Sequence, residues 1–256
     1  MAVRLGATSC VLEADLPANV RAVAELVDDV ELVLYDVPGH GCNFPDAATA
    51  AELRRLAERH DLTYTVHLPR DLAEGDDSSL DQARRAIDAT RSLEPYAYVA
   101  HLDGTALMGT PGASEVAAWQ AQADTVLRRV AEWVGEPRRL CLENVERWDP
   151  AHFAPVVAEV PVSRCIDVGH LWLEERDALA HLRAWLGRTR VVHLHGVHGP
   201  DHQSLAHVPL ERSQPVVDCL STTFSGVVTL EVFSLADLRE SLAAWHGGGG
   251  SSAWAG

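Results

Sequence analysis

The sequence predicts a single (β/α)₈ TIM barrel with a metal site at the carboxyl ends of its strands. Three observations carry this prediction. The chain has 256 residues, which matches the length of about 250 that is typical of this fold. Short apolar runs alternate with helix-like stretches, eight of each. Ionisable side chains recur where the apolar runs end, and in a barrel these ends meet on one face.

The expected strands are continuously apolar, as in Tyr98-Val99-Ala100, which is typical of parallel strands covered on both faces. Asp46, Ser79 and Ser234 precede helical runs and suit N-caps, and Pro150 suits a first helical position. The expected strands run over Val3–Thr8, Val30–Tyr35, Leu62–His67, Ala97–Leu102, Arg139–Glu143, Arg164–Asp167, Val191–His195 and Val227–Val232. The expected helices run over Asn19–Val27, Ala47–His60, Leu80–Leu93, Ala113–Val134, Pro150–Glu159, Glu175–Leu186, Leu210–Leu220 and Leu235–Trp245.

One domain is expected, because residues 1–246 hold all of these elements and 47% of the chain is hydrophobic. Residues 247–256 are rich in Gly and Ser and are expected to be a disordered tail. No signal peptide and no apolar run of membrane-spanning length is recognised. The five cysteines are odd in number and form no CxxC pair, which predicts free thiols in a reducing cytoplasm.

The net charge of the chain limits the classes of partner that it can bind. Lys plus Arg is 21 and Asp plus Glu is 37, so the net charge is −16. A chain this acidic repels polyanions at long range, which argues against nucleic acids and anionic membrane surfaces as partners. A small anionic substrate stays compatible, because a bound cation reverses the local charge.

The strand ends carry histidines and carboxylates. Glu143, Asp167 and Glu231 would place three negative charges in one apolar mouth, and no Lys or Arg stands at a matching strand end. Unpaired buried carboxylates cost several kcal/mol; divalent cations remove that cost. Imidazole and carboxylate together suit zinc, manganese or iron, and we expect two or three such ions. The ligand candidates outside the carboxylates are His67, His101, His170 and His193.

The segment after the seventh strand is rich in further candidates. His193 and His195 share one face of that strand, and Asp201 and His202 could hold an additional metal with His170. The roles of His195, His198 and His207 stay open. Each residue alone also has a structural explanation, such as a rim histidine or a carboxylate that caps a turn. Outside this set, Glu31 and Asp36 flank the second strand, and Arg70 could touch a phosphate or lie on the surface.

The order of these residues on successive strands resembles the xylose isomerase-like barrel superfamily, which includes endonuclease IV-type phosphodiesterases and sugar isomerases or epimerases. Within it, segments such as Leu62–Pro69, His193–Val197, Asp201–Leu205 and Thr229–Ser234 look like the cobamide remodelling phosphodiesterases of bacteria. The resemblance implies a corrinoid substrate, the cobamide, whose nucleotide-loop phosphoester is hydrolysed.

The resemblance also implies ligand roles. His67 and His101 would bind one metal, Glu143 would bridge it to a second, and Asp167, His193 and Glu231 would complete that second site. Glu143 and Glu231 would be the catalytic carboxylates. His170, Asp201 and His202 match the third-metal positions, although Asp201 and His202 are adjacent here, whereas endonuclease IV has one residue between its corresponding Asp and His.

Two enzyme classes compete on these residues. A metal-dependent phosphodiesterase uses neighbouring metals for in-line displacement at phosphorus. A sugar or sugar-phosphate isomerase or epimerase needs one metal, held by Glu143, Asp167, His193 and Glu231, and two glutamates that move protons. The additional His67 and His101 favour several metals and hydrolysis.

Overall fold

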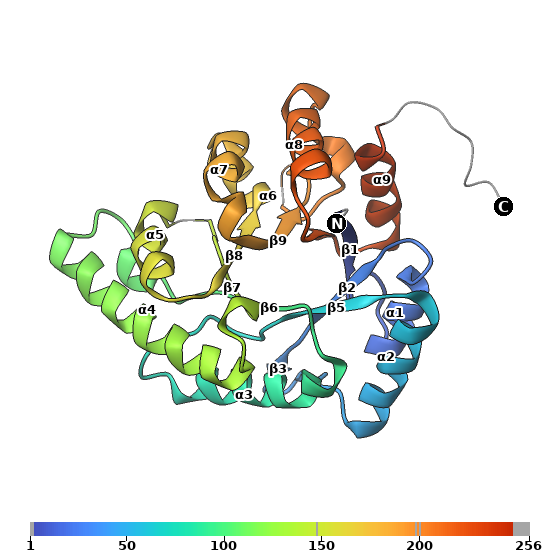
Figure 1. The fold of residues 1–256 in the computed structure, drawn as a ribbon, viewed down its shortest axis with the longest axis horizontal. Helices are drawn as coiled ribbons and strands as arrows, with labels where there is room; N and C mark the ends of the chain where they lie inside the picture. The colour runs from blue at the N-terminus through green and yellow to red at the C-terminus, as the bar shows by residue number, and fades with distance from the viewer. Residues whose placement is uncertain (1–2, 147, 198, 200, 248–256) are drawn as a thin grey trace.

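Eight parallel strands close into a barrel with the order β1-β10-β9-β8-β7-β6-β5-β2, and the helices surround it (Figure 1). This computed structural model describes residues 3–146, 148–197, 199 and 201–247. The predicted (β/α)₈ fold is confirmed. The barrel strands are β1 Arg4–Thr8, β2 Asp29–Val33, β5 Thr63–His67, β6 Ala97–Ala100, β7 Leu140–Glu143, β8 Ser163–Asp167, β9 Thr189–Leu194 and β10 Val227–Leu230.

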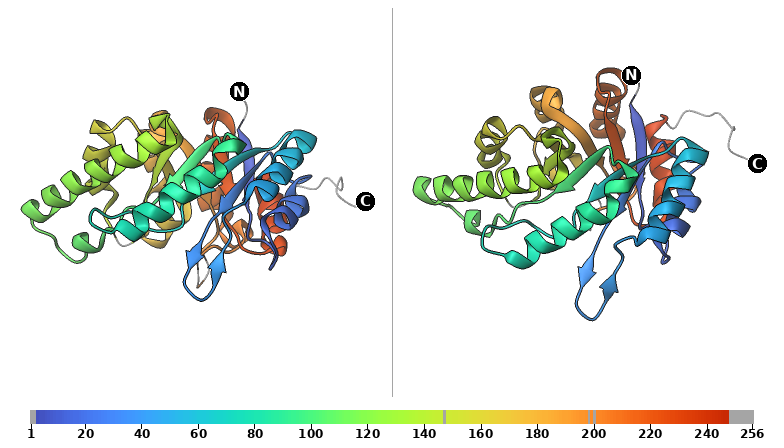
Figure 2. Two further views of the ribbon diagram at one scale, coloured as in Figure 1. Left: turned by 90° about the horizontal axis from the view of Figure 1, so that it is seen from below. Right: turned by 60° about the horizontal axis from the view of Figure 1, so that its bottom comes forward.

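Helices follow the strands along the chain. The α-helices are α1 Leu16–Val23, α2 Ala47–His60, α3 Asp77–Thr90, α4 Ala113–Val134, α5 Pro150–Glu159, α6 Val168–Leu173, α7 Ala178–Trp185, α8 Leu210–Thr223 and α9 Leu235–Trp245. Short 3₁₀ helices cover Arg91–Leu93, Thr105–Leu107, Pro137–Arg139, Leu186–Arg188 and Leu205–His207. A small antiparallel hairpin, which the sequence did not predict, pairs β3 Asp36–Val37 with β4 Gly41–Cys42 and projects beyond β2 (Figure 2).

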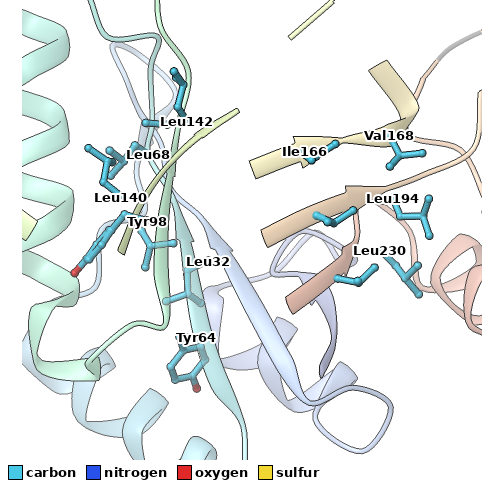
Figure 3. Close-up of a cluster of buried hydrophobic side chains, with 14 of the residues drawn as sticks. Leu32, Tyr64, Leu68, Tyr98, Leu140, Leu142, Ile166, Val168, Leu194 and Leu230 are labelled. Carbon is cyan, nitrogen blue, oxygen red and sulfur yellow. The ribbon is translucent and has the colours of Figure 1, made fainter. Parts of the chain in front are cut away.

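Two apolar layers build the core. Side chains such as Leu32, Ile166, Leu194 and Leu230 are buried in the large cluster that joins strands and helices (Figure 3). A separate small cluster comes from alternate positions of β6, β7, β8 and β9, which therefore face the barrel interior. Its members are Ala97, Val99, Cys141, Cys165 and Val191. The buried Cys141 and Cys165 are free thiols, as expected.

Several predicted helix starts are confirmed. Asp46 and Ser234 cap α2 and α9 through their side chains, and Pro150 is the first residue of α5. Ser79 as an N-cap is wrong. Asp76 caps α3 instead, since its carboxylate accepts from the backbone N–H groups of Ser78 and Ser79.

Several predicted helices had wrong bounds: α3 covers Asp77–Thr90 rather than Leu80–Leu93, and α8 extends to Thr223 rather than Leu220. α1 begins at Leu16 rather than Asn19, because Asp15 accepts from the N–H of Ala18 and so starts the helix earlier. The helix expected over Glu175–Leu186 is in fact preceded by a separate helix, α6, that begins directly at the end of β8. Glu175 itself has φ 55°, which interrupts helical geometry, and Asp177 caps the following α7.

The expected tail falls largely outside the described residues, as does His198. Within the described part of the chain, no helix combines the length and the apolar character that crossing a membrane requires.

Candidate metal centre

Four side chains meet at the carboxyl ends of β7, β8, β9 and β10. We call Glu143, Asp167, His193 and Glu231 the central cluster; one potential ligand atom from each lies within 4.8 Å of the others. His193 Nδ1 lies 3.3 Å from Glu143 Oε1 and 3.1 Å from Glu231 Oε2. His193 and Asp167 are fully buried. Three carboxylates and one imidazole at this spacing form a ligand set for one divalent cation.

A second cluster adjoins the first through Glu143. It consists of His67 at the end of β5, His101 directly after β6, and Glu143. The Nε2 atoms of His101 and His67 lie 3.0 Å and 3.5 Å from Glu143 Oε2. The two oxygens of Glu143 therefore face different clusters: Oε1 faces His193 and Oε2 faces the two histidines. Such a carboxylate is placed to bridge two cations.

A third cluster adjoins the central cluster through Asp167. It consists of Asp167, His170, His195 and His202. His195 Nε2 lies 3.3 Å from Asp167 Oδ1, and His170 Nδ1 lies 3.4 Å from Asp167 Oδ2. His170 is in α6, which begins at the end of β8, and Asp167 caps that helix by accepting from the N–H of His170 at 2.7 Å.

Local backbone features shape this third cluster. A Cβ on Gly169 would meet the His195 ring at 2.1 Å, so only glycine leaves room for that ring. His202 has φ 53°, the left-handed region that costs a non-glycine residue on the order of 1 kcal/mol or more. Its N–H donates to His195 Nδ1 at 3.0 Å. Strain of this kind, held by neighbouring contacts, is common at binding sites.

Asp201 takes a different place from the one the resemblance implies. Its carboxylate lies 3.2 Å from His202 Nδ1, and it is not one of the four residues whose ligand atoms converge. His195 occupies that fourth position instead. The sequence did carry a signal for His195, since it shares a strand face with His193.

The residues present fit bound cations. Six buried atoms point into the three clusters and, although some of them face one another at 3.0 to 3.1 Å, none makes a hydrogen bond of good geometry among the described residues: His101 Nε2, Glu143 Oε2, Asp167 Oδ2, His193 Nδ1, His195 Nε2 and Glu231 Oε2. Buried polar atoms are normally satisfied, so this set of orphaned nitrogen and oxygen atoms indicates a missing partner. Zinc, manganese or iron suits such donors.

The charges of the clusters offset one another when no cation is present. Burial lowers the pKa of His101, but the charge of Glu143 and the bond to Asp71 raise it to about 10. Burial likewise lowers the pKa of His202, and the bond to Glu231 and its charge raise it to about 9. Burial raises the pKa of Glu143, yet His193 and His101 bring it well below its ordinary value. Protonated histidines thus balance the negative charge of the carboxylates, as a bound cation would.

Two carboxylates support the clusters from outside. Asp71 lies 3.2 Å from His101 Nδ1, on the ring side away from Glu143, and Glu31 on β2 lies 3.0 Å from His193 Nε2. Asp71 lies in a loop with no periodic signal and could not be found from the sequence, whereas Glu31 carries only the weak signal of flanking the second strand.

The remaining candidates lie apart from the clusters. Asp36 pairs with Arg85 on α3, and Arg70 pairs with Asp76 at 3.3 Å. His207 lies in the 3₁₀ helix Leu205–His207 and belongs to none of the potential ligand groups found among the described residues. The chain contains no lysine, so chemistry through a lysine Schiff base is excluded.

Comparisons with known proteins agree on the fold. The family model described as "Xylose isomerase-like TIM barrel" matches residues 20–246. A D-tagatose 3-epimerase-like protein has 18% identity and a TM-score of 0.74, covering 95% of this chain and 97% of its own. A 3-keto-D-glucoside 4-epimerase from E. coli has 16% identity and a TM-score of 0.70, covering 95% and 99%.

An AP endonuclease of family 2 from Brucella melitensis has 16% identity and a TM-score of 0.69, covering 98% of this chain and 100% of its own. No curated protein matches the chain. At these identities the solved structures establish the shared barrel and leave the reaction to be argued from the site.

Proposed function

The chain belongs to the xylose isomerase-like TIM barrel family, and within that family we propose that it is a metal-dependent phosphodiesterase with a multinuclear centre. The observation that carries the proposal is the position of Glu143. Its two oxygens face His193 on one side and the pair His67 and His101 on the other. A one-metal isomerase has no use for that second, histidine-rich subsite.

The protein's own residues have distinct tasks in this proposal. Glu143 and Asp167 each belong to two clusters, so each of them would hold two neighbouring cations. His67 and His101 close the second cluster on its exposed side, since they retain 15% and 23% side-chain exposure. When bound, neighbouring divalent cations neutralise phosphoryl charge and activate water for in-line displacement.

The surroundings of the site favour a large substrate. The large hydrophobic side chains that are exposed among the described residues lie in the connections between a barrel strand and the helices that follow it, or at an end of one of these helices. In a barrel these connections surround the face that holds the clusters. The exposed side chains are Leu12, Tyr35, Val37, Met108, Leu173, Leu210 and Phe233, between 38% and 64% exposed. Phe233 also stacks on His202 at 5.0 Å. An apolar rim of this kind suits the body of a bulky ligand better than a free sugar.

The substrate proposed is therefore an intact cobamide, and the bond cleaved is the phosphoester of its nucleotide loop. Two arguments support this choice: the resemblance of several segments to cobamide remodelling phosphodiesterases, and the apolar rim. The corrin ring would rest on the rim while the phosphodiester reaches the clusters. The net charge of −16 disfavours DNA as the alternative phosphodiester.

A sugar epimerase is the second candidate. The central cluster alone supplies one cation site and two glutamates, Glu143 and Glu231, that could move protons. The structural neighbours named as 3- and 4-epimerases favour this candidate at the level of the fold.

One experiment separates the two candidates. Metal-loaded protein is incubated with a complete cobamide and, separately, with a panel of ketoses and ketose phosphates, and products are identified by mass spectrometry. We expect a corrinoid without its nucleotide loop, formed only with metal. Epimerised sugar together with an untouched cobamide would overturn the proposal and establish the second candidate.

Paired histidine variants sharpen the result. The double substitution His67→Ala, His101→Ala should abolish hydrolysis while the fold persists. The double substitution His60→Ala, His246→Ala removes the same number of imidazoles at the ends of α2 and α9, away from the clusters. It should leave hydrolysis unchanged.

A further inference from the structure

The interior of the barrel is divided into an apolar half and a polar half. Side chains of β6, β7, β8 and β9 fill one half with small apolar groups and two thiols. Side chains of β2, β5 and β10 fill the other with polar groups. The fully buried members of the polar half are Asp29, Glu31, Thr65 and Thr229. Polar groups placed this deep in a barrel need a reason, because their desolvation is costly.

Glu31 is the member of this polar half that reaches the metal centre. Its Oε2 lies 3.0 Å from His193 Nε2, and both side chains are fully buried. The opposite ring nitrogen, Nδ1, faces Glu143 Oε1 at 3.3 Å and Glu231 Oε2 at 3.1 Å. The imidazole of His193 thus stands between one carboxylate below and the central cluster above.

We propose that Glu31 is a positioning residue of the central cluster: it accepts the Nε2–H bond of His193 and so presents the Nδ1 lone pair to the cation. The inference rests on the metal centre of the proposed function and adds a residue that touches neither substrate nor cation. A histidine ligand is commonly oriented by a carboxylate on its other nitrogen, which fixes the tautomer and the ring.

The other histidines show that this orientation is specific. His67 and His101 face Glu143 with Nε2. Their Nδ1 atoms face the backbone carbonyl of Leu68 at 3.0 Å and the carboxylate of Asp71. His193 has the reverse arrangement, with Nδ1 toward the cluster, and Glu31 is the group on its Nε2 side. Without an acceptor there, the ring has no hydrogen bond that holds Nε2 protonated.

A purely structural role explains Glu31 poorly. Its second oxygen, Oε1, is buried and has no hydrogen-bond partner among the described residues. A carboxylate that is half satisfied in a dry interior is worse for folding than an apolar side chain. The hydrogen bond to Glu31 becomes stronger when His193 binds a cation, because the bound imidazole is a better donor toward the carboxylate.

The test measures zinc binding to the full-length, metal-free protein by competition with a chromogenic chelator, together with thermal melting of the metal-free form. Glu31→Leu removes the acceptor and the charge. Glu31→Gln keeps an acceptor oxygen and removes the charge. Thr229→Val is the matched control, since Thr229 is equally buried and is the register partner of His193 on β10.

We expect Glu31→Leu to weaken one zinc site by about 10- to 100-fold, Glu31→Gln to weaken it less, and Thr229→Val to leave all sites unchanged. A residue with only a structural role would change the melting temperature and leave zinc affinity as it was. Unchanged zinc affinity in Glu31→Leu overturns the inference. If that variant does not fold, Glu31→Met, which also lacks an acceptor, replaces it, and unchanged zinc affinity in Glu31→Met overturns the inference equally.

The outcome is independent of the reaction catalysed. Loss of zinc affinity in a protein that leaves cobamides intact would sustain the role of Glu31 and reject the phosphodiesterase. Cobamide hydrolysis by the parent protein, with unchanged zinc affinity in the variants, would support the phosphodiesterase and reject the role of Glu31.

Discussion

Binding of metal to the metal-free protein is expected to release protons, because the histidines of the second and third clusters hold protons where cations would sit. Without metal the pKa of His101 is about 10 and that of His202 about 9. Both are therefore protonated at pH 7.5. Ligation needs the neutral imidazole, so filling these two clusters should release about two protons per chain from these residues.

The pH dependence of the stability of the metal-free protein follows from the direction of these pKa shifts. Both pKa values lie above the ordinary 6.5, so protonation stabilises the metal-free fold fully below pH 6.5. That stabilisation is lost as the pH rises through about 9 to 10. The protons compete with the cation over the same range, and the apparent affinity of the second cluster should fall about tenfold per pH unit below 10.

Calorimetric titration with Zn²⁺ at pH 7.5 in two buffers of different ionisation enthalpy counts the protons released. His101→Ala should remove about one of them and leave the contribution of His202. Binding heats that do not depend on the buffer would refute the reasoning. So would a His101→Ala variant that releases as many protons as the parent protein.

Three further outcomes are expected. A strong chelator should abolish activity and lower the melting temperature, because bound metal stabilises the folded state by mass action; unchanged melting and activity would contradict the metal centre. Glu143→Gln and Glu231→Gln should each reduce the rate by about 10³-fold or more, and Asp201→Asn by less, since Asp201 pairs with His202 but is not among the four residues whose ligand atoms converge; equal small losses in steady-state assays would remove these roles. Burial raises the pKa of Asp29 from 3.8 to about 7, so stability should fall as the pH rises from about 4 to about 7. In urea unfolding, the free energy of unfolding of Asp29→Asn relative to that of the parent protein should rise by at most about 2–3 kcal/mol between pH 5 and pH 8. A difference that stays constant with pH would show that Asp29 titrates normally.

Much of the barrel could be predicted because each element carries a local signal. Continuous apolar runs such as Tyr98–Ala100 mark parallel strands, and Asp46 and Ser234 mark helix starts. The error at Glu175 arose because α6 depends on a tertiary feature. Asp167 caps it from the end of a strand, and no turn residue separates strand from helix.

Residues of the site were predictable where a strand end exposed them. His67, His101, Glu143 and Glu231 each end or directly follow a strand, which is where barrel sites form. Residues that act through a neighbour had weaker signals. Asp71 reaches His101 from a loop, and Glu31 reaches His193 across the barrel interior. Neither contact follows from spacing along the chain.

The arrangement of the third cluster could be predicted from the sequence only in part. Their position in the loop and the family resemblance predicted Asp201 and His202 as a ligand pair, but the left-handed backbone at His202 sets the directions of the two side chains. His202 faces Glu231 and His195, while Asp201 stays 40% exposed on the outer side. A dihedral angle of this kind is decided by the packing of the loop.

The central claim is that several cations share Glu143 and Asp167. Elemental analysis of the purified, metal-saturated protein tests it most directly, with the His67→Ala, His101→Ala variant measured alongside. The account predicts two or three divalent ions per chain in the parent protein and one fewer in the variant. A single ion per chain, retained in full by the variant, would contradict it.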